Sequence, residues 1–252
     1  MSAKNKAKAK PASSDRKRVV FTQGGKGGVA KTEVALSLAS WYAERDLQPT
    51  MLDLDIENTE KGGLSDFYPQ AKPFDIHEQG TLDEFLTACD GGSPVVLADM
   101  GAGAGKATYA WFENAADIAQ SLGVRFTAIG VTTNEASSVQ AILRWAGHLQ
   151  DSVDYLIVLN EMRRPRCPFE YWYDEPRVQE FVKALKPRVM RMDSRVEEFQ
   201  AELRNQSLTL QDVATGNVTD PFFRLTKNKV RAIQYQRTLF GGFDEAADIL
   251  LP

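Results

Sequence analysis

The sequence predicts a doubly wound α/β domain, with a mostly parallel sheet and helices on both of its faces. Short apolar runs alternate along the chain with segments whose apolar residues have helical spacing. Polar or glycine-rich residues follow several of these runs, at the edge where such sheets bind ligands. The length of 252 residues and a hydrophobic content of 43% allow one large domain with a full core.

Each expected strand is a short apolar run bounded by polar or glycine residues. The six expected strands cover residues 18–23, 50–55, 94–99, 124–131, 153–160 and 187–192, of which the last is the weakest. Helices are expected between them, where apolar residues recur every three or four positions. They cover residues 31–45, 81–89, 107–121, 135–149, started by Asn134, and 175–185, with further helices near 194–205 and 221–249.

Charge divides the chain into a basic tail, expected to be disordered over residues 1–17, and a domain over residues 18–252. Residues 1–18 carry seven Lys and Arg against one Asp, hence +6, which leaves −10 for the rest of a chain of net charge −4. Such a tail attracts polyanions without specificity, and a solubilising leader is an equally open alternative. We expect a cytoplasmic protein, because no signal peptide or membrane-crossing run is recognisable.

A glycine-rich stretch, GGKGGVAKTE at residues 24–33, joins the first strand to the first helix. Backbone N–H groups at such a turn, together with the helix N-terminus, bind anions. Residues 25–32 fit the phosphate-loop pattern G-x-x-x-x-G-K-[ST] except at Ala30. We therefore expect ATP as ligand, with Lys31 at its β- and γ-phosphates and the Thr32 hydroxyl on Mg²⁺.

Ala30 stands where the phosphate-loop pattern has its last glycine, and two readings of it are open. If the position needs a positive φ, alanine costs about 1 kcal/mol or more. If φ is negative, only a methyl group is added. Nucleotide binding is expected to survive in both cases, whereas the rate of hydrolysis is in doubt.

KGGVAKT at residues 26–32 resembles the deviant Walker A motif KGGxxK[ST] of the ParA/MinD family of ATPases. The resemblance implies a P-loop NTPase fold of the SIMIBI type. It also implies that Lys26 crosses a dimer interface to the partner subunit's nucleotide, while Lys31 holds the nucleotide of its own subunit. A solvated loop residue is the alternative reading of Lys26. The implied nucleotide contacts on the loop are Gly24, Gly25, Lys26, Gly27, Gly28, Val29, Ala30, Lys31, Thr32 and Glu33.

Two further motifs extend the resemblance. MLDLDIEN at residues 51–58 is similar to the family's strand ending in D-x-D, and residues two apart on a strand point the same way. Asp53 and Asp55 are therefore expected to face the phosphates. By the family's pattern, Asp55 positions the attacking water as a catalytic residue beside Lys26 and Lys31, and Asp53 supports the magnesium shell. The usual Pro-Gln after D-x-D is absent.

PVVLADMGAG at residues 94–103 resembles the Walker B and switch II region, without its common D-x-P-P form. The resemblance implies that Asp99 reaches Mg²⁺ through water and that Gly101 offers an N–H near the γ-phosphate. Asn160 resembles the asparagine that reads the adenine edge, although an asparagine that closes a strand is often only a turn residue.

The resemblance covers roughly residues 18–215 and implies a ParA-like switch. ATP and Mg²⁺ would close a homodimer, and slow, partner-stimulated hydrolysis would open it. Such switches partition plasmids or chromosomes or position protein cargo, with a ParB-like protein or a cargo adaptor as partner. The acidic C-terminal run FGGFDEAADILLP lacks the basic amphipathic helix of membrane-cycling relatives, so no membrane partner is expected.

DNA is the expected matrix, which would place the protein on the nucleoid. Arg224, Lys227 and Arg231 have the i, i+3, i+7 spacing of one helix face and are the candidate non-specific contacts; a solvated face is the alternative. Two other functions stay open. One is a metabolic enzyme that activates a carboxylate with ATP and needs a second small-molecule pocket. The other is an ATP-bound adaptor that hardly hydrolyses.

Overall fold

The computed structural model describes residues 16–23, 25–55, 62–75, 80–162 and 169–252. The tail expected over residues 1–17 lies outside this part of the chain except for Arg16 and Lys17, and Lys17 already belongs to the first strand. Gly24 of the glycine-rich stretch also lies outside it. Within the described residues, no helix is long and apolar enough to cross a membrane.

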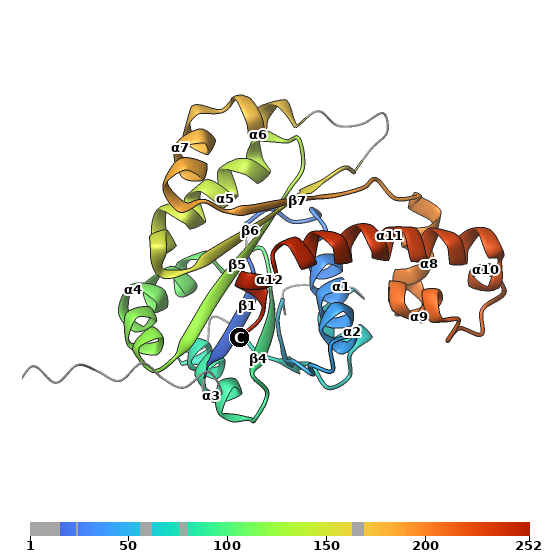
Figure 1. The fold of residues 1–252 in the computed structure, drawn as a ribbon, viewed down its shortest axis with the longest axis horizontal. Coiled ribbons are helices and arrows are strands. Elements are labelled where there is room, and N and C mark those ends of the chain that lie inside the picture. The colour runs from blue at the N-terminus through green and yellow to red at the C-terminus, as the bar shows by residue number, and fades with distance from the viewer. Residues whose placement is uncertain (1–15, 24, 56–61, 76–79, 163–168) are drawn as a thin grey trace, which may run out of the picture.

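The centre of the molecule is a seven-stranded parallel sheet with the order β3-β2-β4-β1-β5-β6-β7 (Figure 1). This confirms the predicted fold class. The two-residue strand β3 was not predicted, because two residues give no periodic signal. The strands are β1 (Lys17–Thr22), β2 (Thr50–Leu54), β3 (Lys72–Pro73), β4 (Val95–Met100), β5 (Val124–Thr132), β6 (Asp154–Asn160) and β7 (Arg188–Met192).

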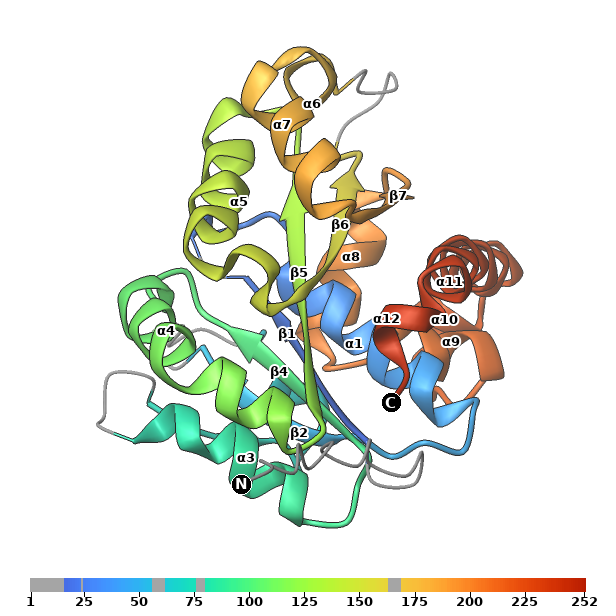
Figure 2. The same cartoon turned by 60° about the vertical axis from the view of Figure 1, so that its left-hand side comes forward.

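Helices cover both faces of the sheet, and Figure 2 shows the strands between the two layers. One face packs under α3 (Glu84–Asp90), α4 (Gly105–Ser121), α5 (Ala136–Leu149), α6 (Glu170–Asp174) and α7 (Pro176–Leu185). The other packs under α1 (Lys31–Ala43), α2 (Leu64–Phe67), α8 (Glu197–Asn205), α9 (Leu210–Thr215), α10 (Pro221–Arg224), α11 (Thr226–Glu245) and α12 (Ala247–Leu250). Each face has its own apolar core, which explains why the central strands are apolar throughout.

The start of α5 differs in detail from the sequence expectation. Its N-cap is Glu135 rather than Asn134, and the cap makes no side-chain hydrogen bond. Instead, the Ser138 hydroxyl accepts a hydrogen bond from the Thr133 N–H at 3.1 Å and bonds to the Thr132 hydroxyl at 2.7 Å. The turn is therefore closed by a residue inside the helix, which leaves Glu135 at the surface.

The single helix predicted over residues 221–249 is wrong, because the chain leaves helical geometry at Leu225 and again at Ala246. Phe223 is buried and packs edge-on against Phe199, which turns α10 inward. The Asn228 amide then donates to the Phe222 carbonyl at 2.8 Å, which ties the first turn of α11 to α10 across the break.

The long helix α11 is fixed to the rest of the fold near its C-terminal end. At Gly242 it lies so close to β7 that an added Cβ would be 2.4 Å from Met190 Cε. Nearby, the Trp41 indole on α1 donates to Asp244 Oδ1 at 2.9 Å. The N-terminal end of α11 lies instead against α9 and α10, away from the sheet (Figure 1).

Candidate nucleotide site

The glycine-rich loop follows β1 and ends at the first residue of α1, so its backbone N–H groups surround a helix N-terminus. Gly25 and Gly28 have φ values of 119° and 72°, which explains two of the glycines. Ala30 also has a positive φ, at 78°, and precedes α1 as its N-cap. The first of the two readings of Ala30 therefore holds, and the loop carries a strained alanine.

Close packing holds the first half of this loop. A Cβ added at Gly25 would lie 2.9 Å from Ala141 Cβ on α5, so only glycine fits without a shift. The Gly25 N–H donates to the Ala102 carbonyl at 2.8 Å, in the segment that follows β4. The phosphate loop and the loop after β4 are therefore joined directly.

Lys31 is buried at the base of the loop. Its ammonium donates to the Lys26 carbonyl at 3.0 Å. Burial lowers the pKa of Lys31 below its usual value, and the nearby Asp99 and Asp55 carboxylates act in the opposite direction. Lys31 therefore lies at the base of the phosphate loop and within electrostatic reach of two carboxylates; its contact with phosphate stays a prediction.

Lys26 lies in a different environment from Lys31. Its side chain is 42% exposed and its ammonium is 3.3 Å from Glu135 Oε2, on the loop before α5. An exposed ion pair of this kind contributes only about 0–1 kcal/mol, so a phosphate can replace it at little cost. The two lysines of the loop therefore differ: one is buried under the loop, and the other is displayed at its surface.

Asp99 is the most buried carboxylate at this edge of the sheet. Its Oδ1 accepts a hydrogen bond from the Thr22 hydroxyl at 2.7 Å, and its Oδ2 has no hydrogen-bond partner among the described residues. Burial raises the pKa of Asp99 to about 6, and the Thr32 and Thr22 hydroxyls and Lys31 act in the opposite direction. An orphaned carboxylate oxygen beside Thr32 suits a hydrated Mg²⁺ ion.

Asp53 and Asp55 have different surroundings, although both were predicted to face the phosphates. Asp53 lies directly across from Asp99 in the register of β2 and β4. Its Oδ2 accepts from the Ser65 N–H at 2.8 Å, in the first turn of α2, and its Oδ1 accepts from the Asp55 N–H at 3.2 Å. Asp53 therefore already stabilises the start of α2 and the turn after β2.

Asp55 follows the end of β2 and lies against Gly101, which follows β4. A Cβ added at Gly101 would be 2.5 Å from Asp55 Oδ1 and 3.2 Å from Asp55 Cα. Asp55 also lies near enough to Lys31 to act on its pKa. The structure thus brings together Lys31, Asp55, Asp99 and Gly101, which come from three separate motifs, while their roles toward a nucleotide stay predictions.

Asn160 closes β6, and its amide donates to the Val29 carbonyl of the phosphate loop at 2.9 Å. The side chain is buried by this contact. The structure therefore gives Asn160 a place in holding the loop, which the sequence did not predict.

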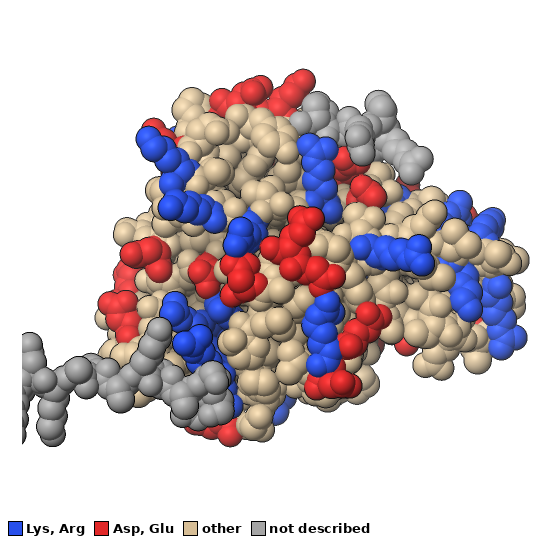
Figure 3. All heavy atoms as spheres, in the orientation of Figure 1, with Lys and Arg blue, Asp and Glu red and all other residues tan. Residues whose placement is uncertain are grey.

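The three candidate DNA contacts do not lie on one helix, because Leu225 separates Arg224 from α11. Arg224 and Lys227 are exposed, and Arg231 is half-buried and donates to Asn228 Oδ1 at 2.9 Å. Figure 3 shows Lys and Arg side chains gathered over this end of the molecule. Basic side chains therefore do gather at this end of the molecule. They come from α10 and α11, and not from one face of a single helix as predicted.

Three further residues at the site were missed from the sequence. Thr22 binds Asp99, Glu135 binds Lys26, and Arg195 lies against the phosphate-loop helix, where its guanidinium pairs with Glu33. Thr22 immediately precedes the loop and gave a usable signal, as a polar residue at the end of an apolar strand. Glu135 and Arg195 come from distant loops at the same sheet edge, and nothing in their local sequence marks them.

A parallel sheet with a lysine-bearing glycine loop at its centre and carboxylates on the next strands defines a P-loop nucleotide-binding protein. Residues 20–238 match the CobQ/CobB/MinD/ParA nucleotide binding domain, and the chain belongs to this family. The ParA/MinD resemblance of the motifs is thereby confirmed. A comparison with curated proteins gives no match.

Solved structures share the fold. An McdA variant from Cyanothece in complex with ATP superposes with a TM-score of 0.53 at 12% identity, over 93% of this chain and 97% of the other. The septum site-determining protein MinD from Pyrococcus horikoshii, complexed with Mg-ADP, gives 0.52 at 16% identity, over 92% and 98%. At such identities the likeness concerns the fold alone.

Proposed function

We propose that this protein is a ParA-like ATPase that closes into a homodimer when it binds ATP and Mg²⁺, and that slow hydrolysis opens the dimer again. The observation that carries the proposal is the contrast between the two lysines of one loop. Lys31 is buried against Asp99 and Asp55, whereas Lys26 is displayed at the surface in a weak ion pair. A lysine displayed in this way is available to the phosphates of a second subunit.

The residues fit ATP and Mg²⁺. The N–H groups of the loop and the Lys31 ammonium bind phosphate, and the Thr32 hydroxyl and the orphaned Asp99 oxygen accommodate a hydrated cation. Bound Mg²⁺ supplies charge neutralisation on the phosphate oxygens. Asp55 orients the attacking water, and the absence of a side chain at Gly101 leaves room for the Asp55 carboxylate. Asp53, which accepts from the Asp55 N–H, supports the magnesium shell without binding the ion directly.

The test distinguishes the roles of Lys26 and Lys31 in a variant that hardly hydrolyses ATP. Asp55→Ala is expected to bind ATP, to turn it over at most about a hundredth as fast, and to accumulate as a dimer in light scattering. Lys26→Ala in that background is expected to bind ATP as a monomer. Lys31→Ala is expected to lose nucleotide binding itself.

A Lys26→Ala, Asp55→Ala protein that still dimerises with ATP would return Lys26 to the role of a solvated surface residue. Unchanged turnover in Asp55→Ala would move the water-positioning role to another carboxylate. If Lys26→Ala alone hydrolyses ATP normally as a monomer, the enzyme alternative becomes the better explanation.

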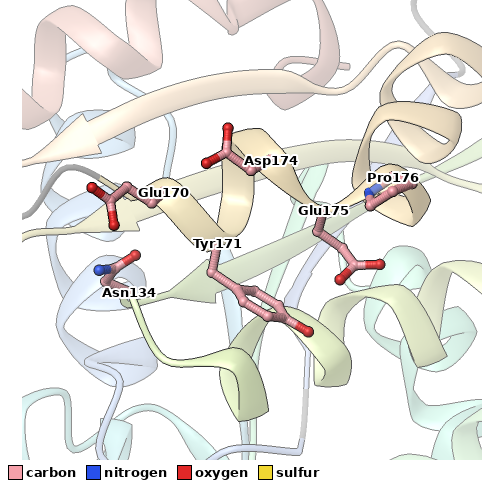
Figure 4. A pocket seen from close by; sticks show the side chains of 6 residues that line it. All are labelled: Asn134, Glu170, Tyr171, Asp174, Glu175 and Pro176. Atoms are coloured by element: carbon pink, nitrogen blue, oxygen red, sulfur yellow. The ribbon is translucent and has the colours of Figure 1, made fainter.

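That alternative, an enzyme that activates a carboxylate with ATP, has one observation in its favour. A cavity of about 460 Å³ opens beside the loop before α5, lined by Asn134, Glu170, Tyr171, Asp174, Glu175 and Pro176 (Figure 4). Asn134, in its lining, directly precedes Glu135, the residue that pairs with Lys26. The acidic lining of the cavity disfavours a carboxylate substrate, however, which is why we rank the switch first.

We further propose that the basic end around α10 and α11 binds DNA without sequence specificity, so that DNA is the matrix. A ParB-like protein or cargo adaptor is the proposed partner that stimulates hydrolysis. Arg224 and Lys227 are exposed at this basic end. Phosphate contacts by such residues need no base recognition, which suits a protein that cycles on and off a matrix. The strained Ala30 keeps open the adaptor that hardly hydrolyses.

A further inference from the structure

Glu33 is an acidic residue in the first turn of the helix that begins the phosphate site. It follows Thr32 directly, and its side chain is 24% exposed. A carboxylate there is favourable for the helix dipole of the empty protein. It also occupies the positive end of the helix that a polyphosphate uses, and two anions at one helix end repel each other.

Arg195 faces this carboxylate from the loop after β7. Its Nη1 forms an ion pair with Glu33, and its side chain is only 5% exposed. Neither Nη1 nor Nη2 has a hydrogen-bond partner among the described residues, so the ion pair is the contact that compensates the buried charge. Burial lowers the pKa of Arg195 to about 9, with Tyr235 acting in the opposite direction, which leaves it charged at neutral pH. A buried guanidinium is costly unless it is paired, so the two charges of this pair depend on each other.

Contacts with α11 hold the loop that carries Arg195. The Arg195 guanidinium carbon lies 5.4 Å from the centre of the Tyr235 ring. The Val196 N–H donates to the Tyr235 hydroxyl at 3.2 Å, and the Thr238 hydroxyl donates to Asp193 Oδ2 at 3.4 Å. Arg195 is therefore presented to Glu33 by a supported loop rather than by a free side chain.

We propose that Arg195 is a positioning residue that neutralises Glu33 and so allows the first turn of α1 to accept a polyphosphate. The inference rests on the proposed nucleotide-binding function. It assigns to the loop after β7 a share of nucleotide affinity without any contact between Arg195 and the phosphates. The size of this share grows with the charge of the nucleotide, because the opposing force is electrostatic.

The test is a double-mutant cycle on the full chain, with Mg-ADP and a non-hydrolysable Mg-ATP analogue as probes in calorimetric titration. Arg195→Met, which leaves Glu33 unpaired, is expected to weaken the ATP analogue about tenfold and ADP by less. Glu33→Gln is expected to tighten binding. The double variant Glu33→Gln, Arg195→Met is expected to return to within about threefold of the wild type, since both charges are gone.

Two controls keep the outcome readable. Arg195→Lys retains the positive charge and is therefore expected to bind the ATP analogue more tightly than Arg195→Met does. If Arg195→Met fails to fold, the double variant still carries the test, because it contains no unpaired buried charge and its melting temperature is measured without nucleotide.

A double variant as weak as Arg195→Met would overturn the inference, since Arg195 would then act by direct contact or by packing. Equal losses for ADP and the ATP analogue would overturn it as well. A wild-type protein that binds neither probe would instead refute the proposed nucleotide function. If the wild type binds both probes but the affinities of the variants do not follow the charges at positions 33 and 195, only the role of Arg195 is refuted.

Discussion

The Asp55 carboxylate fills the space that a side chain at Gly101 would need: a Cβ at position 101 would lie 2.5 Å from Asp55 Oδ1. These residues follow neighbouring strands, β4 and β2, whose register places Asp53 opposite Asp99. The glycine after β4 is therefore explained by the aspartate after β2. A side chain at position 101 has to move the carboxylate that we assign to the attacking water.

Gly101→Ala is expected to lower ATP turnover by about tenfold to a hundredfold, because a displacement of about 1 Å is enough to misplace a catalytic group. Nucleotide affinity is expected to change little, since Lys31 and the loop stay in place. Steady-state phosphate release and calorimetric titration measure the two effects. Gly147→Ala is the matched control, because a Cβ at that helical glycine meets nothing within 4 Å; equal losses in both variants would contradict the Asp55 explanation.

Ala30→Gly is expected to raise the free energy of unfolding of the nucleotide-free protein by about 0.5–1 kcal/mol, because glycine relieves the strain at φ 78°. Gly28→Ala, at φ 72°, is expected to have the opposite effect by about 1 kcal/mol. Urea denaturation measures both. A destabilised Ala30→Gly protein would show that the loop does not carry strain at this position.

Asp99 gives a pH dependence whose sign follows from its raised pKa of about 6 against an ordinary 3.8. The folded protein holds the proton more tightly than the unfolded chain does. The stability that Asp99 contributes is therefore present below about pH 4 and is lost as the pH rises towards 6, by about 3 kcal/mol in all. Denaturation of the wild type and of Asp99→Asn across this range isolates the effect, and parallel curves would argue against the shift.

The same titration acts on Mg²⁺ in the opposite direction. A cation needs the ionised carboxylate, so the Mg²⁺-dependent part of nucleotide affinity is expected to rise with pH through about 6 in the wild type. Asp99→Asn is expected to lose this rise. Because the nucleotide itself also titrates, the difference between the two proteins is the quantity to compare.

The basic end of the molecule predicts a salt-dependent interaction with DNA. Arg224→Glu with Lys227→Glu is expected to weaken ATP-dependent binding on all sequences alike and to reduce the slope of log K against log salt by about 2. Arg144→Glu with Lys183→Glu makes the same change of net charge on exposed residues of α5 and α7, under the opposite face of the sheet. Fluorescence anisotropy at several salt concentrations measures the DNA affinity of both double variants. Equal losses of affinity in the two would assign the binding to net charge alone.

Most of the strands and of the phosphate loop could be predicted, because each is local in sequence. VVF, MLDL and VVLAD are buried runs of strand length, and GGKGGVAKT carries its own pattern. The conformation of Ala30 could not be predicted, because φ depends on what the loop packs against. Here that includes Ala141 of α5, which is distant in the chain.

The partners of the site residues were also beyond local reasoning. D-x-D predicted two equivalent carboxylates, yet Asp53 binds the first turn of α2, a four-residue helix with too short a pattern to detect. The break at Leu225 depends on the burial of Phe223 by Phe199, a contact between helices that periodicity does not describe. Tertiary contacts, rather than propensity, decide such positions.

The contacts of α11 connect the phosphate loop with the basic end of the molecule. Its fixed end is joined to α1 through Trp41 and Asp244, and α1 begins at the phosphate loop. Lys227 lies fifteen residues from Gly242, or about 22 Å along the helix axis at 1.5 Å per residue. Between these positions, Tyr235 and Thr238 bind the loop after β7, and the N-terminal end of α11 packs against α9 and α10. A shift of α1 on nucleotide binding is therefore expected to move α11 together with α9, α10 and the loop after β7, and spin labels at positions 183 and 227 would measure the displacement of the basic end.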